Sequence, residues 1–222
     1  IIEVKSERNF NTYIKENKRA SIEELGKNIF YINVDSITKE ELNSRINDLA
    51  EANGVIIDVR GYPHQILTEI ISHIIDTTVN SANWLIPQFI YPDRDNMTWQ
   101  KSNWQVYPAT PKFKGKIIFL TDGRAISAAE TFMGIIENYK LGEIIGEPTA
   151  GTNGNLNYFT MQGGNYYICF TGMKVLKHDG SQHHLIGIQP TIPVHRTIKG
   201  VQEGRDEFIE KAIEIIKSDK KH

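Results

Sequence analysis

The stretch KIIFLTDGRAISAAETFMGIIENYKLGEIIG, residues 116–146, decides the fold. It opens on the apolar run Lys116–Leu120, of the kind that a parallel sheet buries on both faces. Asp122 and Gly123 end this run, and apolar side chains then recur at helical spacing. A second short apolar run, Gly142–Gly146, follows the predicted helix. The order strand, helix, strand predicts a right-handed crossover between parallel strands.

The same unit occurs earlier in the chain. Residues 28–34 alternate with a period of two, which predicts a strand, and Thr38–Glu41 matches a capping box that begins an amphipathic helix. Residues 54–59 form another continuous apolar run, and residues 66–75 predict a strongly apolar helix. A last amphipathic helix is predicted over residues 205–217. The fold class is therefore α/β, with a mainly parallel sheet and strand–helix crossovers.

The remaining segments define the predicted domain organisation. Residues 1–26 are polar and rich in Lys and Glu, and we interpret them as a linker or the remnant of an upstream region. Residues 27–222 form the predicted core domain. Within it, residues 77–114 are an aromatic-rich excursion, either lining a substrate cleft or forming an edge hairpin with its own small core. Residues 155–175 predict a hairpin that turns at Gly163-Gly164.

Composition excludes several classes of protein. Of 222 residues, 40% are hydrophobic and 23% charged, which is typical of a globular chain. A net charge of -2 and the lack of dense basic clusters argue against a nucleic-acid partner. No apolar run approaches the roughly 20 residues of a membrane span. The single cysteine, Cys169, excludes an internal disulfide and a Cys/His metal framework, and we expect it in a buried strand.

Ser127 stands where the helix after Lys116–Leu120 begins, and it has two interpretations. As a helix cap it accepts a hydrogen bond from a backbone N–H, and the local sequence alone favours this role. As a nucleophile it gains from the same place, because the N–H groups of Ala128 and Ala129 point toward a developing oxyanion. In the turn after residues 54–59, Gly61 is positioned to add a second N–H donor.

Three stretches together carry a family resemblance: GVIIDVRGYP (54–63), GKIIFL to GTNG (115–154) and DGSQHHLIGIQPTIPV (179–194). They resemble the C-terminal processing, or tail-specific, serine peptidases and their tricorn-like relatives. The resemblance extends over roughly residues 27–217. It implies a ClpP/crotonase-like fold, a peptide or protein substrate, no cofactor and an extracytoplasmic location.

The resemblance also implies roles for individual residues. Ser127 corresponds to the nucleophile, and the backbone N–H groups of Ala128 and Gly61 correspond to the oxyanion donors. The processing-peptidase branch has a lysine base where this chain has Thr152, which excludes that Ser-Lys dyad because threonine does not take up a proton at neutral pH. The tricorn-like branch instead uses a histidine from sequence ahead of the core.

The general base is therefore open at the level of sequence. His184 and His183 stand in the turn where the tricorn-like branch has a carboxylate, and they are the first candidates, followed by His64 or an upstream histidine. The spacing of the histidines fits no metal motif, so we expect no metal. Glu130 and Glu147 are candidates to orient a base, although an exposed helix face and a turn fit them as well.

The sequence thus favours a serine endopeptidase. The alternative is a catalytically inactive module that binds peptides or small apolar ligands on the same fold, which Thr152 and the missing base favour. An acyl-CoA enzyme of the crotonase type shares the fold class but has little support in these motifs.

Overall fold

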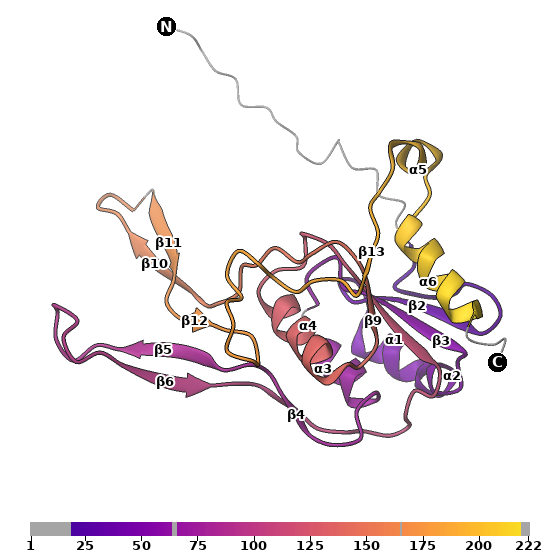
Figure 1. Ribbon diagram of the computed structural model, residues 1–222, viewed down its shortest axis with the longest axis horizontal. Helices are drawn as coiled ribbons and strands as arrows, with labels where there is room; N and C mark the ends of the chain where they lie inside the picture. Colours follow the sequence, from indigo (N-terminus) through magenta and orange to yellow (C-terminus); the bar gives the residue numbers. More distant parts are fainter. Residues whose placement is uncertain (1–18, 64–65, 165, 219–222) are drawn as a thin grey trace, which may run out of the picture.

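The computed structural model describes residues 19–63, 66–164 and 166–218. Its centre is a six-stranded sheet of order β1-β2-β3-β8-β9-β13 (Figure 1). Strand β1 pairs antiparallel with β2, and all the other neighbours in this sheet are parallel, which confirms the predicted sheet. The strands are β1 (Ile22–Glu24), β2 (Ile29–Asn33), β3 (Gly54–Asp58), β8 (Lys116–Thr121), β9 (Glu143–Gly146) and β13 (Ile192–Pro193). The paired sheet thus begins at Ile22, ahead of the core boundary that the sequence pattern indicates, because three residues are too few to show a period.

Helices cover both faces of this sheet (Figure 1). One face packs against four helices, α1 (Lys39–Ser44), α2 (Ile46–Ala50), α3 (Ile66–Ser72) and α4 (Ala128–Tyr139). The other face packs against α6 (Glu207–Ser218). The continuous apolar runs follow from this arrangement, since alternate strand residues enter two different cores. The predicted capping box at the start of α1 is present.

The register of the two central strands places the loops that matter for function. Strands β3 and β8 are parallel neighbours, and Asp58 at the end of β3 lies opposite Leu120. Their carboxyl ends therefore share one edge of the sheet, where α/β proteins commonly bind ligands. The turn after β3 contains Gly61, and the loop after β8 leads to Ser127.

Two hairpins project from the same side of the core (Figure 1). Strands β5 and β6 form one antiparallel hairpin, with β12 paired to β5, and β10 and β11 form the other. The second confirms the hairpin predicted over residues 155–175, and Gly163 and Gly164 in its turn both have positive φ. The remaining elements are β4 (Val79–Asn80), β5 (Trp84–Gln88), β6 (Thr98–Ser102), β7 (Gln105–Val106), β10 (Leu156–Thr160), β11 (Tyr167–Thr171), β12 (Lys174–Val175) and α5 (Ile198–Glu203).

The prediction for Cys169 is wrong. This cysteine lies in β11 and is exposed, because every residue of β10 and β11 is exposed and nothing among the described residues covers either face of the hairpin. None of the helices in the described part of the chain has the length and hydrophobicity of a bilayer-spanning segment.

Candidate active site

Ser127 precedes the first residue of α4 in an unusual backbone conformation. Its φ is 53° and its ψ is -113°, and its side chain makes no capping hydrogen bond. A non-glycine residue held in such a region costs about 1–3 kcal/mol, and this strain often marks a functional position. The structure therefore does not support the cap alternative. The backbone N–H of Ser127 donates to the Thr152 carbonyl oxygen at 3.0 Å, which ties the start of α4 to the loop after β9.

A groove of about 800 Å³ opens beside this serine. Ala128, which follows Ser127, and Tyr62, which follows Gly61, both line it. The backbone N–H groups of Ala128 and Gly61 donate to no acceptor among the described residues. The other residues that line the groove, Trp104 among them, carry no charge. The two turns singled out in the sequence thus meet at one uncharged groove.

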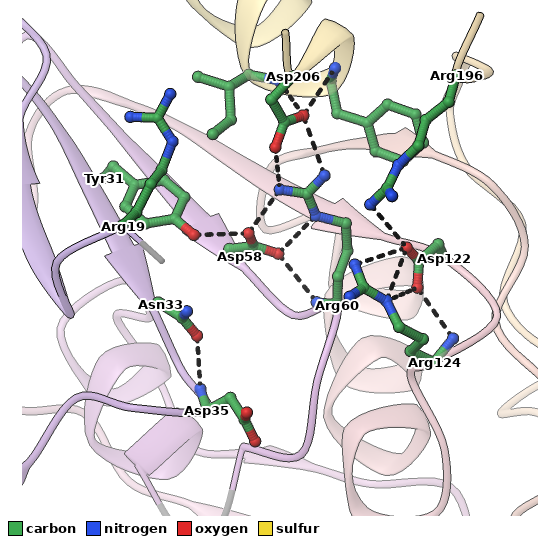
Figure 2. A network of polar contacts seen from close by, with 12 residues as sticks. Arg19, Tyr31, Asn33, Asp35, Asp58, Arg60, Asp122, Arg124, Arg196 and Asp206 are labelled. Carbon is green, nitrogen blue, oxygen red and sulfur yellow. Dashed lines mark hydrogen bonds and ion pairs between the residues drawn. The ribbon is translucent and has the colours of Figure 1, made fainter. Parts of the chain in front are cut away.

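The turn at Gly61 is held against the loop that follows β2. A Cβ atom placed on Gly61 would lie 2.9 Å from the Cβ of Asp35, which is closer than side chains normally approach. The Asp35 carboxylate accepts a hydrogen bond from the N–H of Tyr62 at 3.1 Å. The N–H of Asp35 donates to Asn33 Oδ1 at 3.0 Å (Figure 2). Glycine at position 61 is therefore required by this close contact.

Glu130 lies in the first turn of α4 and organises the loop after β9. The interpretation of an exposed helix face is wrong, because Glu130 is 1% exposed and that loop covers it. Its Oε1 accepts from Thr149 Oγ1 and from the N–H of Gly151, both at 2.6 Å, and its Oε2 accepts from the N–H of Thr152 at 2.8 Å. Burial opposes its ionisation, but the adjacent His183, Thr149 and Gly151 lower the pKa of Glu130 overall. Glu130 thereby fixes the loop whose carbonyl group holds Ser127.

The two histidines of the candidate turn have different surroundings. His183 is buried, and its Nε2 lies 3.3 Å from Glu130 Oε1 without the alignment of a hydrogen bond. His184 is exposed. The N–H of Leu185 donates to the Gly151 carbonyl oxygen at 2.9 Å, so this turn is attached to the loop that Glu130 organises. No hydrogen bond joins Ser127 to either imidazole among the described residues.

The other described histidines have partners of their own. Ring nitrogens of His73 and His178 lie 2.7 and 2.8 Å from backbone carbonyl oxygens, and these nitrogens therefore carry protons. His195 Nδ1 lies 3.0 Å from Glu147 Oε1 at the surface. His64 lies outside the described residues. Over the part of the chain that the structure describes, no three His, Cys, Asp or Glu side chains form a group able to hold a metal ion.

Sequence reasoning missed a buried charged cluster beside the Gly61 turn. Arg60 makes hydrogen bonds with the carboxylates of Asp58 and Asp206, and the Tyr31 hydroxyl donates to Asp58 at 2.7 Å (Figure 2). Burial, with the adjacent Asp58 carboxylate, raises the pKa of Tyr31. The signal available in the sequence was weak, because Asp206 is 146 positions away from Arg60.

Comparison with known proteins identifies the family of this chain. The model of peptidase family S41 matches residues 28–194, and the chain therefore belongs to that family. A search of curated protein sequences finds no significant match. The family assignment confirms the resemblance seen in the sequence.

Solved structures show the same fold at low sequence identity. A candidate peptidase from Parabacteroides merdae superposes with a TM-score of 0.73 at 20% identity, covering 88% of this chain and 63% of that one. The tricorn protease has a TM-score of 0.53 at 20% identity, covering 86% and 18%. The photosystem II D1 C-terminal processing protease has a TM-score of 0.52 at 14% identity, covering 75% and 42%. The ClpP/crotonase-like fold is confirmed, and this chain spans less than two thirds of each of these proteins.

Proposed function

We propose that this chain is the catalytic core of a serine endopeptidase that cleaves peptides or proteins, with Ser127 as the nucleophile. Ser127 Oγ attacks the peptide carbonyl carbon and a histidine accepts its proton. The N–H groups of Ala128 and Gly61 stabilise the oxyanion. The amine then leaves with that proton, and water hydrolyses the acyl-enzyme. The observation that carries the proposal is the strained, uncapped Ser127, whose neighbour Ala128 lines an uncharged groove.

We assign the general base to His184, with His183 in support. His184 is exposed on a turn that is hydrogen-bonded to the loop holding Ser127, whereas His183 faces the buried Glu130. Thr152, which stands where the processing peptidases have a lysine base, accepts a hydrogen bond from the N–H of Ser127 through its backbone carbonyl oxygen and is not a base in this mechanism. No cofactor or metal enters the mechanism, and we place the protein outside the cytoplasm on the basis of the family resemblance.

The first test uses a fluorophosphonate probe on the full-length protein. We expect covalent labelling of the wild type, loss of labelling in Ser127→Ala, and full labelling in the control Ser181→Ala, which removes an exposed hydroxyl elsewhere. The measurement is in-gel fluorescence with mass-spectrometric location of the adduct. Absence of labelling in the folded wild type would contradict the proposal and favour the inactive binding module.

The second test concerns the base. His184→Ala should lower peptide hydrolysis by at least about 100-fold, since general base catalysis contributes about 10²–10⁴-fold. Its melting temperature should stay within about 1 °C of the wild type, because the imidazole is exposed. His195→Ala, which removes another exposed imidazole, is the matched control. Full activity in His184→Ala would move the role to another histidine.

A further inference from the structure

Figure 2 shows the cluster of Asp58, Arg60 and Asp206, called the Arg60 cluster below. Arg60 directly precedes Gly61 in the chain. Nε and Nη2 of Arg60 donate to the two carboxylate oxygens of Asp58 at 2.8 and 2.7 Å. Nη1 and Nη2 donate to the two oxygens of Asp206 at 3.0 and 2.7 Å. The Arg60 side chain is only 5% exposed. Two bidentate contacts fix both the position and the plane of this guanidinium.

The cluster also fixes the backbone. The N–H of Arg60 donates to Asp58 Oδ1 at 3.0 Å, so Asp58 holds both the main chain and the side chain of residue 60. Gly61 is the next residue, and it is flanked on its other side by the Asp35 contact with Tyr62. Buried ion pairs are weak evidence of stability, because desolvation offsets most of their attraction. Their geometric precision is therefore the more informative property of this cluster.

Asp206 connects the turn to a rigid element far along the chain. It lies just before α6 and accepts hydrogen bonds from the N–H groups of Phe208 and Ile209, at 3.2 and 3.4 Å. The Arg60 guanidinium also lies over the Phe208 ring, 5.2 Å from its centroid. Because Phe208 and Ile209 are buried in the core beneath the sheet, α6 gives the carboxylate a fixed position.

The same C-terminal segment reaches the second loop of the candidate site. Arg196 lies 3.8 Å from the carboxylate of Asp122, at the start of the loop that leads to Ser127 (Figure 2). Asp122 in turn accepts the backbone N–H of Arg124 at 2.9 Å. Residues 196–206 therefore contact both loops that carry a proposed oxyanion donor.

We propose that Arg60 and Asp206 are positioning residues for the oxyanion site, which hold the Gly61 N–H toward the carbonyl group attacked by Ser127. They act through the backbone of the turn and do not touch the substrate. This inference rests on the proposed peptidase function. The contribution of α6 to catalysis is then geometric, since it anchors the carboxylate that sets the Arg60 side chain.

The test is Asp206→Asn. Asparagine caps a helix as well as aspartate does, so α6 keeps its N-terminal hydrogen bonds while Arg60 loses a charged partner. The matched control is Glu210→Gln in α6, which removes the carboxylate of another bidentate arginine pair, Arg205–Glu210, at the surface. Arg60→Lys keeps the positive charge and loses the fork geometry, so it should behave as Asp206→Asn does.

The readout is the kinetics of fluorophosphonate labelling of the full-length protein, because the phosphonyl oxygen takes the place of the oxyanion. For Asp206→Asn we expect the maximal labelling rate to fall about 10-fold to 100-fold, with the concentration for half-maximal rate changed less than about 2-fold. Glu210→Gln should label as the wild type does. An unchanged rate in a folded Asp206→Asn protein overturns the inference while leaving the peptidase proposal in place.

A second readout does not depend on activity. In ¹⁵N-labelled protein the Gly61 amide resonance should shift or broaden in Asp206→Asn and not in Glu210→Gln. If the wild type fails to label, the peptidase proposal fails by itself, and the Gly61 resonance still decides whether Asp206 positions the turn. A Gly61 resonance identical in all three proteins would overturn the inference.

Discussion

At the residue scale, Ser127 and Gly61 are each restricted to a small residue, for different reasons. Ser127 keeps a positive φ that costs free energy, and its hydroxyl makes no hydrogen bond among the described residues. Gly61 has no such strain, because it is absent from the positive-φ residues, but it lacks space for a Cβ atom. The first residue is thus restricted by its backbone and the second by its neighbour, Asp35.

The contact at Gly61 gives a prediction. Gly61→Ala should lower the rate of fluorophosphonate labelling by at least about 10-fold, because the added Cβ pushes the turn away from Asp35 and misplaces the N–H. Overpacking of this kind typically costs about 1–3 kcal/mol of stability as well. Urea unfolding and labelling rates measure the two effects. Gly123→Ala is the matched control, since a Cβ there meets nothing within 4 Å, and equal behaviour of the two variants would contradict the prediction.

At the element scale, α4 does more than present Ser127. Its buried Glu130 accepts three hydrogen bonds from the loop after β9, and the Thr152 carbonyl oxygen of that loop accepts one from the N–H of Ser127. Helix α4 and the loop after β9 therefore fix each other's position through these hydrogen bonds. The start of α4 and the turn with His183 and His184 are coupled through the same loop.

Glu130→Gln tests this coupling. Glutamine keeps the size of the side chain, but its amide group points a donor at a backbone N–H or at Thr149, so one buried partner loses its acceptor. We expect a loss of about 1–3 kcal/mol in the free energy of unfolding and slower labelling of Ser127. Glu137→Gln, two turns further along α4 and partly exposed, is the matched control. Unchanged stability and unchanged labelling would contradict the coupling.

The sequence was informative where local patterns decide the structure. Apolar runs and helical spacing predicted the parallel sheet, the capped helix α1 and the hairpin β10–β11, since each depends on nearby residues. The surroundings of Glu130 and Cys169 were mispredicted, because burial there depends on whether another segment covers them. Asp206 was missed for the same reason, as its partner Arg60 is distant in sequence.

At the scale of the whole molecule, the candidate site lies where two cores are joined by the sheet. The Arg60 cluster and α6 belong to one face, while α4 and Glu130 belong to the other. The half-buried Asp206 and the buried Glu130 therefore hold loops at this edge of the sheet from its two faces. The contacts of Asp206 and Glu130 require ionised carboxylates, so the free energy of unfolding of the whole fold depends on pH.

The direction of this linkage follows from two pKa shifts. Burial opposes ionisation of Asp206, but the hydrogen bonds and charge of Arg60 lower its pKa overall, and the pKa of Glu130 is likewise lowered. A carboxylate whose pKa is lowered by folding stabilises the folded state above its unfolded pKa, about 3.9 for Asp and 4.3 for Glu. That stabilisation is lost as the pH falls through the lower folded values.

We therefore expect the contribution of Asp206 and Glu130 to the free energy of unfolding to be nearly constant from pH 7 to pH 5. Below about pH 4 this contribution should fall steadily. Urea unfolding at several pH values measures this dependence. Asp206→Asn and Glu130→Gln should each have a lower free energy of unfolding at pH 7. In acid this free energy should decrease less steeply than in the wild type, because each variant lacks one carboxylate that takes up a proton on unfolding. Glu210→Gln supplies the comparison for a surface pair. If both buried-site variants kept the wild-type acid slope, the carboxylates would not be the groups that link this fold to pH.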